Sequence, residues 1–136
     1  MKGIADTGFV VAFLNRNDVH HDWAVGVAEQ VSEPLLTCDA VLAEAAFHVG
    51  DCGKVLDLVQ SGLLLPDFSV AEHSAHLRVL AKRYVDRSPD LADLCLIRLS
   101  ELYPRHSVIT VDVQDFRIYR RNRRETIPLI SPPGPS

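Results

Sequence analysis

Short apolar runs alternate with segments of helical periodicity along the whole chain, and this alternation constrains the fold more than any other feature. The apolar runs lie at residues 3–5, 35–38, 63–65, 106–111 and 126–130. The helical segments lie at residues 7–15, 20–31, 40–49, 53–60, 71–85, 90–102 and 114–121. Strands that alternate with helices form a parallel sheet covered on both faces. The pattern therefore predicts an α/β fold with a central parallel sheet.

The length of 136 residues, with 47% hydrophobic content, is enough for one domain with a core of its own. We predict a single domain over residues 1–130 and a Pro-rich tail over residues 131–136. No stretch approaches the roughly 20 apolar residues of a membrane span, and the start carries no apolar segment of signal-peptide length. We therefore expect a soluble, cytoplasmic protein with no membrane partner.

The cysteines and histidines form no metal-binding motif. Cys38, Cys52 and Cys95 show no paired zinc-type spacing, and their apolar neighbours predict reduced core residues. The histidine pairs 20–21 and 73–76 lack a third ligand in a zinc pattern, so surface positions are expected for them.

Two carboxylates stand where buried strands end. Asp6 follows the run 3–5 and Asp112 follows the run 108–111. Each alone would usually be a turn residue that accepts a backbone N–H. If the two strands are neighbours, however, their backbones lie about 4.8 Å apart and their carboxyl ends open onto the same crevice. Like charges about 4 Å apart repel by about 4 kcal/mol at an effective dielectric near 20, so the pair predicts a bound cation.

A third carboxylate lies in the helical segment 90–102, which is apolar nearly all round. Asp90 is placed to cap this helix, whereas Asp93 shares a covered face with Ile97 and Ser100. A buried, unpaired carboxylate costs several kcal/mol, so Asp93 is predicted to meet a cation. Glu44, flanked by alanines and Phe47, is a weaker candidate for the same site. Ligands that are all oxygen select Mg²⁺ or Mn²⁺ over zinc.

Other polar residues near these acids have two interpretations each. Asp115 is an additional ligand or the cap of the segment 114–121. Thr7 and Thr110 orient the acids or satisfy backbone groups. The net charge of −4 argues against a simple basic nucleic-acid surface. Even so, arginines crowd into the eight residues 117–124, where they form a solvated helix face or contact phosphates: Arg117, Arg120, Arg121, Arg123 and Arg124.

The order of these motifs resembles that of the PIN-domain ribonucleases, and most closely the VapC-like toxins of bacterial toxin–antitoxin pairs. The resemblance covers essentially the whole chain and rests on Ala5-Asp6-Thr7-Gly8, Asn17-Asp18 with His20-His21, Leu42-Ala43-Glu44, Asp90-Leu91-Ala92-Asp93-Leu94, and Thr110-Val111-Asp112 with Asp115-Phe116. It implies a three-layer α/β/α sandwich with strand order 3-2-1-4-5. Leu94 departs from the small residue usual after the third acid, which suggests altered packing.

The resemblance also implies a function. Asp6, Glu44, Asp93 and Asp112 match the acidic quartet of the family, and Asp115 matches an extra acid of many members. The hypothesis is a Mg²⁺-dependent endoribonuclease, with Mn²⁺ as a substitute. In it Asp6, Asp93 and Asp112 hold the ion, and Glu44 positions the attacking water. Phosphate contacts are assigned to Arg117, Arg120 and Arg121. The implied partners are RNA, a cognate antitoxin and a second copy of the chain.

Three alternatives remain open. The triplet Asp6-Thr7-Gly8 is also similar to that of aspartic proteases, which need two such triplets in an all-β fold. A receiver-like domain would need a phospho-acceptor such as Asp67 together with a well-placed lysine, and this lysine is missing. A PIN-like binding module that only engages a protein partner is the main alternative to the enzyme.

Overall fold

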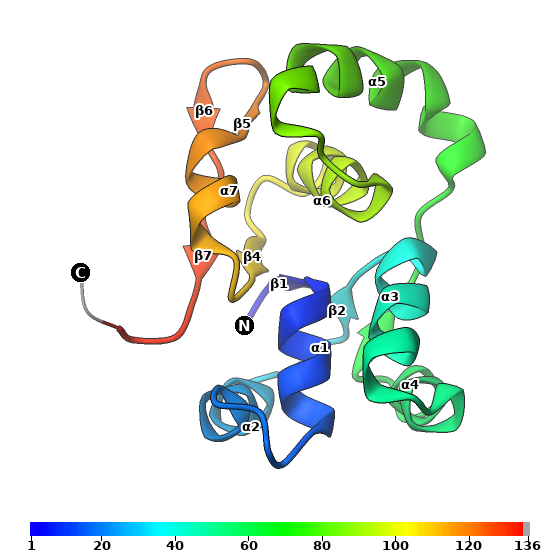
Figure 1. Ribbon diagram of the computed structural model, residues 1–136, viewed down its shortest axis with the longest axis vertical. Coiled ribbons are helices and arrows are strands. Elements are labelled where there is room, and N and C mark those ends of the chain that lie inside the picture. The colour runs from blue at the N-terminus through cyan, green and yellow to red at the C-terminus, as the bar shows by residue number, and fades with distance from the viewer. Residues whose placement is uncertain (135–136) are drawn as a thin grey trace.

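The computed structural model describes residues 1–134 and is built around a five-stranded parallel sheet (Figure 1). The order across the sheet is β3-β2-β1-β4-β7, and all four pairings are parallel. Its strands are β1 (Gly3–Ala5), β2 (Leu35–Leu36), β3 (Leu64–Leu65), β4 (Ser107–Ile109) and β7 (Leu129–Ile130). The predicted fold class and strand order are confirmed, with β7 as the fifth strand. Of the predicted tail 131–136, the last two residues lie outside the described part.

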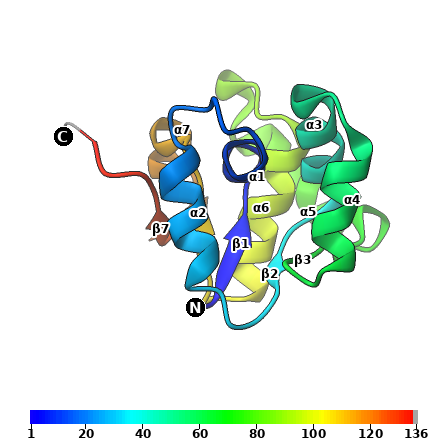
Figure 2. The same cartoon turned by 90° about the horizontal axis from the view of Figure 1, so that it is seen from below.

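Helices cover both faces of the sheet. In Figure 1, α1 and α2 lie below the sheet, and α6 lies above it with α5 packed against it. Figure 2 shows the molecule from the side of α1 and α2. No helix within residues 1–134 is long and apolar enough to cross a bilayer. The helices are α1 (Thr7–Leu14), α2 (His21–Glu29), α3 (Asp39–Val49), α4 (Cys52–Gln60), α5 (Val70–Arg83), the short 3₁₀ helix η1 (Val85–Arg87), α6 (Leu91–Leu102) and α7 (Val113–Ile118).

Side-chain caps fix where several helices begin. Asp51, Ser69 and Asp90 accept hydrogen bonds from backbone N–H groups in the first turns of α4, α5 and α6. Helix α3 has no side-chain cap of this kind. The helix begins at Asp39 itself, and Cys38 stands at the N-cap without a side-chain bond. An acid in the first turn is still favoured by the helix dipole.

Buried side chains pack on both faces of the sheet, and α6 contributes more of them than any other helix. Cys95, Leu96 and Ile97 are fully buried in α6, as its nearly uniform apolar sequence predicts. Cys52, in contrast, is exposed, which corrects the prediction that all three cysteines are core residues. The reason is the outer position of α4, in which Val55 is the buried residue.

The segment after α7 differs most from the prediction. The expected helix 114–121 ends at Ile118, and the expected strand 126–130 is divided. Strands β5 (Arg120–Arg121) and β6 (Glu125–Thr126) pair as an antiparallel hairpin outside the main sheet. In its turn Asn122 and Arg123 adopt left-handed backbone angles, with φ of 48° and 72°. Only the end of the expected strand, β7, pairs with β4.

Candidate active site

A cleft of about 480 Å³ lies at the carboxyl ends of β1 and β4. Parallel sheets place ligand crevices at this end. The cleft brings together all four acids of the predicted quartet, from four different elements of the fold. Its lining consists of Asp6, Thr7, Gly8, Val11, Asp18, His20, Glu44, His48, Asp90, Asp93, Val111 and Asp112.

Asp6 and Asp112 are fixed to one another through the hydroxyl of Thr110. Thr110 Oγ1 donates to Asp6 Oδ2 at 2.6 Å and accepts from the backbone N–H of Asp112 at 2.8 Å. Asp6 Oδ1 accepts from the N–H of Thr7 at 2.7 Å, which caps α1. Because Thr110 is fully buried and Asp6 is 7% exposed, this network has little freedom to move.

Close packing brings α1 against the loop that carries Asp112. A Cβ atom added to Gly8 would overlap the side chain of Val111. Glycine at this position therefore lets the start of α1, capped by Asp6, approach the end of β4.

Asp93 projects from the first turn of α6 toward Tyr119. The phenolic O–H of Tyr119, a fully buried side chain, donates to Asp93 Oδ2 at 3.0 Å. Asp90 caps α6 by accepting from the N–H of Asp93 at 2.8 Å, as predicted, and it also lines the cleft. Leu94, the departure from the family pattern, packs in the core and is 7% exposed.

Glu44 reaches the cleft from α3 and is held by Thr7. Thr7 Oγ1 donates to Glu44 Oε1 at 2.8 Å. Glu44 is half-buried, but its neighbour Phe47 is 81% exposed. The expected apolar surroundings of Glu44 are therefore only partly present.

Burial of these acids raises their pKa values. It raises the pKa of Asp6 to about 6, and burial together with the charge of Asp90 raises that of Asp93 to about 7. Burial also raises the pKa of Asp112. Within residues 1–134, none of the three carboxylates forms an ion pair with Lys, Arg or His. The site thus concentrates negative charge that the protein itself does not neutralise.

The donor chemistry of the cleft fits a hard divalent cation. Its acids present only oxygen atoms, which Mg²⁺ and Mn²⁺ prefer, and their raised pKa values show that a positive charge would be stabilised there. In the described chain, no three acidic, histidine or cysteine side chains stand close enough to ligate one ion directly. Mg²⁺ keeps several of its waters and binds through one or two carboxylates, so such a site does not need three direct ligands.

Asp115 lies outside the cleft and pairs with Arg87. Its Oδ1 accepts from Arg87 Nη2 at 2.7 Å. It does not cap α7, because Asp112 takes that position and its Oδ1 accepts from the N–H of Asp115 at 3.4 Å. Asp115 thus forms an ion pair outside the cleft and is not part of the acid cluster.

The three arginines predicted to contact phosphates differ in their freedom. Arg117 is exposed on α7. Arg120 folds back on the end of α7 and donates to the carbonyl oxygens of residues 117–119. Arg121 donates through Nη1 to the carbonyl oxygens of Ser100 and Pro104, at 3.2 and 3.0 Å. Arg120 and Arg121 therefore stabilise the backbone around the end of α7, whereas the Arg117 guanidinium has no hydrogen-bond or ion-pair partner within residues 1–134.

Three further polar residues line the cleft that were not predicted as site residues: Asp18, His20 and His48. Asp18 Oδ1 accepts from the N–H of His20 at 2.8 Å and shapes the loop before α2. His20 is half-buried rather than exposed as expected. A usable signal existed for His48, which lies four residues after Glu44 and therefore on the same helix face.

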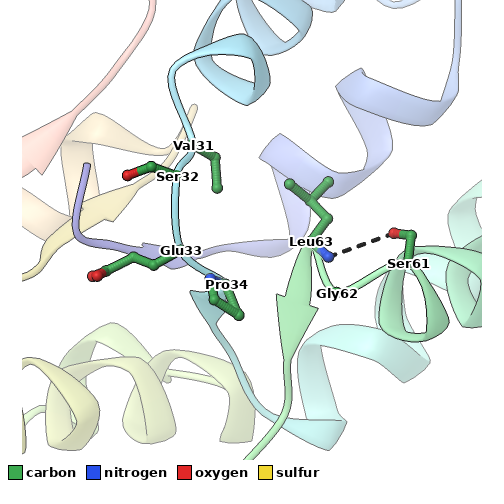
Figure 3. A pocket seen from close by; sticks show the side chains of 7 residues that line it. All are labelled: Val31, Ser32, Glu33, Pro34, Ser61, Gly62 and Leu63. Carbon is green, nitrogen blue, oxygen red and sulfur yellow. Dashed lines mark hydrogen bonds between the residues drawn. The ribbon is translucent and has the colours of Figure 1, made fainter.

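A second hollow, of about 280 Å³, lies at the opposite end of the sheet, and none of the predicted site residues lines it (Figure 3). It is formed by two loop segments, residues 31–34 and 61–63. Ser61 Oγ accepts from the N–H of Leu63 at 3.5 Å, while the Glu33 side chain points away from Leu63. Glu33 instead pairs with Lys2 at 3.2 Å. This hollow gathers no unpaired charge.

Comparison with known families decides the classification of this architecture. The PIN domain family matches residues 4–122, which is most of the chain and includes all four acids. The chain belongs to the PIN-domain family. PIN domains are generally nucleases and typically use a divalent metal. A comparison with curated proteins found no match. The PIN fold, with its parallel sheet, also argues against the aspartic protease alternative.

Proposed function

We propose that this PIN domain is a magnesium-dependent endoribonuclease that hydrolyses RNA phosphodiester bonds. One observation carries the proposal. Asp6, Asp93 and Asp112 converge on one cleft with raised pKa values, and no cationic side chain among residues 1–134 pairs with them. Perturbed acids in a cleft are typical of catalytic sites.

Each acid has a distinct role in this proposal. Asp6, Asp93 and Asp112 would hold the cation, in part through water molecules that it keeps. When bound, Mg²⁺ or Mn²⁺ supplies Lewis-acid chemistry that polarises the scissile phosphate and lowers the pKa of water. Glu44, held by Thr7, orients the water molecule that attacks the phosphorus. Cleavage leaves a 5′-phosphate and a 3′-hydroxyl.

The orienting groups keep the acids in place before the substrate arrives. Thr110 restrains Asp6 through its side chain and Asp112 through its backbone, and Tyr119 restrains Asp93. Such supporting hydrogen bonds commonly tune metal ligands. The phosphates that flank the cut would meet Arg117 first, because Arg120 and Arg121 are bonded within the protein.

We further propose that the protein is the toxin of a toxin–antitoxin pair, that it acts in the cytoplasm, and that it forms a homodimer. The resemblance to VapC-like toxins supports this assignment. Apolar surface for a protein partner exists on α3 and α4, where Phe47 is 81% and Leu56 is 56% exposed. Size-exclusion chromatography with light scattering, before and after Phe47→Ser, tests the dimer: loss of a dimer in the variant supports it, and a wild-type monomer contradicts it.

A binding module without catalysis is the second candidate. The observation that favours it is the spacing of the acids, since no three groups in the described chain stand at direct ligation distance. Such a module would bind its partner and leave RNA intact under all conditions.

The test is an incubation of the purified chain with transfer, ribosomal and messenger RNA, in Mg²⁺ or in EDTA, followed by mapping of the cut ends. The proposal predicts cleavage in Mg²⁺ that leaves 5′-phosphates, and no cleavage in EDTA or with Asp6→Asn. Equal cleavage by Asp6→Asn would reveal a contaminating nuclease. Intact RNA under every condition would favour the binding module.

A further inference from the structure

Positive and negative charges are divided between two parts of the chain. Residues 78–136 hold 11 of the 14 Lys and Arg residues but only 7 of the 18 acids. Residues 1–77 hold the other 11 acids and three cations. A net charge of −4 for the whole chain conceals this division. Charge asymmetry of this kind is typical of proteins that bind nucleic acid.

The fold keeps the two parts separate in space. In Figure 1, α5, β5 and β6 lie in the upper part of the molecule, whereas α2 and α4 lie in the lower part. The positive segments are therefore gathered on one side of the sheet.

A hollow of about 410 Å³ lies within this positive region. It is formed where the end of α5, the end of α6 and the turn between β5 and β6 meet. Its lining consists of His76, Val79, Arg83, Glu101, Asn122 and Arg123.

Glu101, the one acid of this hollow, is already neutralised within the protein. Its Oε1 lies 2.8 Å from His76 Nε2 and accepts from Arg98 Nη1 at 3.3 Å. Its Oε2 accepts from the N–H of Asn122 at 2.7 Å. The Glu101 side chain is only 4% exposed. It therefore lies at the bottom of the hollow, where its bond to Asn122 holds the hairpin turn.

The two arginines of the hollow are free. Both Arg83 and Arg123 are exposed, and no hydrogen bond or ion pair within residues 1–134 engages either guanidinium group. Arg123 also has a left-handed backbone with φ of 72°, a conformation unfavourable for arginine. Arg120 and Arg121, in contrast, are bonded to the protein backbone. Arg120 and Arg121 thus stabilise the backbone of the hairpin, whereas Arg123 is exposed in its turn.

We propose that Arg83 and Arg123 bind the phosphate backbone of the RNA strand whose scissile phosphate lies in the acidic cleft. This proposal rests on the proposed ribonuclease function. Guanidinium groups bind phosphate oxygens well because their donors match the geometry of the phosphate. The hollow therefore forms a distal phosphate site outside the reaction centre, and the acidic side of α1 to α4 repels the strand from the opposite direction.

The distal site is within reach of a short strand. Asp93 and Glu101 lie on the same helix, eight residues apart, which corresponds to about 12 Å along the axis of α6. At about 3.4 Å or more per nucleotide, roughly four nucleotides span that length. RNA of one or two nucleotides should therefore not gain from the distal site.

The test measures binding of a fluorescent single-stranded RNA to the full chain in EDTA, where no cleavage occurs, over a range of salt concentrations. The variant is Arg83→Gln/Arg123→Gln. The matched control is Lys2→Gln/Lys54→Gln, which removes the same charge from two exposed residues of the acidic part. Loss of two phosphate contacts should weaken binding at low salt by roughly fivefold to tenfold and reduce the slope of log affinity against log salt by about 1.4. The control should change neither quantity by a comparable amount.

The outcomes are distinct from those of the nuclease test. Equal losses in variant and control would overturn the proposal, because a nonspecific charge effect explains them. Unchanged RNA binding in the variant would also overturn it and would leave an acidic protein partner as the ligand of the hollow. If RNA is never cut but the variant alone loses binding, the distal site stands and the proposed function fails.

Discussion

The two ends of the parallel sheet hold their carboxylates in opposite electrostatic settings. At the carboxyl end, Asp6 is buried and Asp93 is half-buried; both have raised pKa values and accept from hydroxyl or N–H groups. At the opposite end, Glu33 lies 3.2 Å from Lys2 Nζ and 3.9 Å from His106 Nε2. Paired acids stabilise a surface modestly, whereas unpaired buried acids are a cost to the folded protein. The acids that destabilise the metal-free protein are therefore the same acids that are proposed to bind the cation.

The largest effect expected from this contrast concerns catalysis. Asp6→Asn removes a cation ligand but keeps an acceptor for Thr110, so RNA cleavage should fall by about 100-fold or more while the fold is retained. Glu33→Gln at the other end should change cleavage by less than about twofold. Gel assays and circular dichroism of both variants check this. Similar losses in both would remove the distinction between the two ends.

A second effect concerns stability and pH without metal. Because burial raises the pKa of Asp93 from 3.8 to about 7, the folded state holds a proton that the unfolded state releases. The free energy of unfolding therefore decreases as pH rises from about 4 to 7. Asp93→Asn should be more stable than wild type at pH 8, by on the order of 2 kcal/mol after allowance for solvent screening, and equal to it near pH 4.

Urea unfolding of wild type and Asp93→Asn at several pH values measures this difference. The Asn side chain still accepts from Tyr119, so the comparison isolates the charge. A variant that is less stable than wild type at pH 8 would contradict the account.

A third effect concerns the hydroxyl that joins the two strand-end acids. In Thr110→Val, the N–H of Asp112 and one oxygen of Asp6 lose their hydrogen-bond partner while they stay buried. The free energy of unfolding should therefore fall by about 2 kcal/mol. Thr110→Ser keeps the hydroxyl and should recover most of this stability. Thermal unfolding of both variants tests the assignment, and equal stability of Val and Ser would show that the hydroxyl has no such role.

The smallest effect concerns the support of Asp93. Tyr119→Phe removes one donated hydrogen bond and should cost about 1 kcal/mol of stability. Since supporting groups tune metal ligands, affinity for Mg²⁺ should fall by about tenfold. Calorimetric titration compares the variant with Tyr84→Phe, whose hydroxyl bonds the backbone of Arg120 instead. Equal Mg²⁺ affinities in the two variants would contradict a role for Tyr119.

Much of the fold was predictable because local signals and tertiary packing agree. The alternation of strands and helices predicted the parallel sheet, and the strand ends predicted the positions of Asp6 and Asp112. The buried face of α6 predicted that Asp93 meets a cation; the structure gives it the hydroxyl of Tyr119 as a partner, and the cation stays a prediction. In each case the burial of apolar neighbours leaves a pattern in the sequence.

The rest depends on contacts that leave no periodic pattern. The β5–β6 hairpin is built from arginines, and its turn has Arg123 where glycine or asparagine would be expected. It is anchored by distant groups, the backbone of Ser100 and the carboxylate of Glu101. The lining residues His20 and His48 are likewise brought to the cleft by the packing of α1 to α3.

Calorimetric titration of Mg²⁺ into the wild-type chain at pH 6.5, in two buffers of different ionisation enthalpy, tests the central claim most directly. Because the pKa values of Asp6 and Asp93 are raised to about 6 and 7, cation binding should release protons at this pH. We expect saturable binding with proton release. The proton release should disappear above pH 8 and decrease in Asp93→Asn, where residue 93 no longer supplies a proton. Absence of saturable binding, or binding without proton release that persists in Asp93→Asn, would contradict this account.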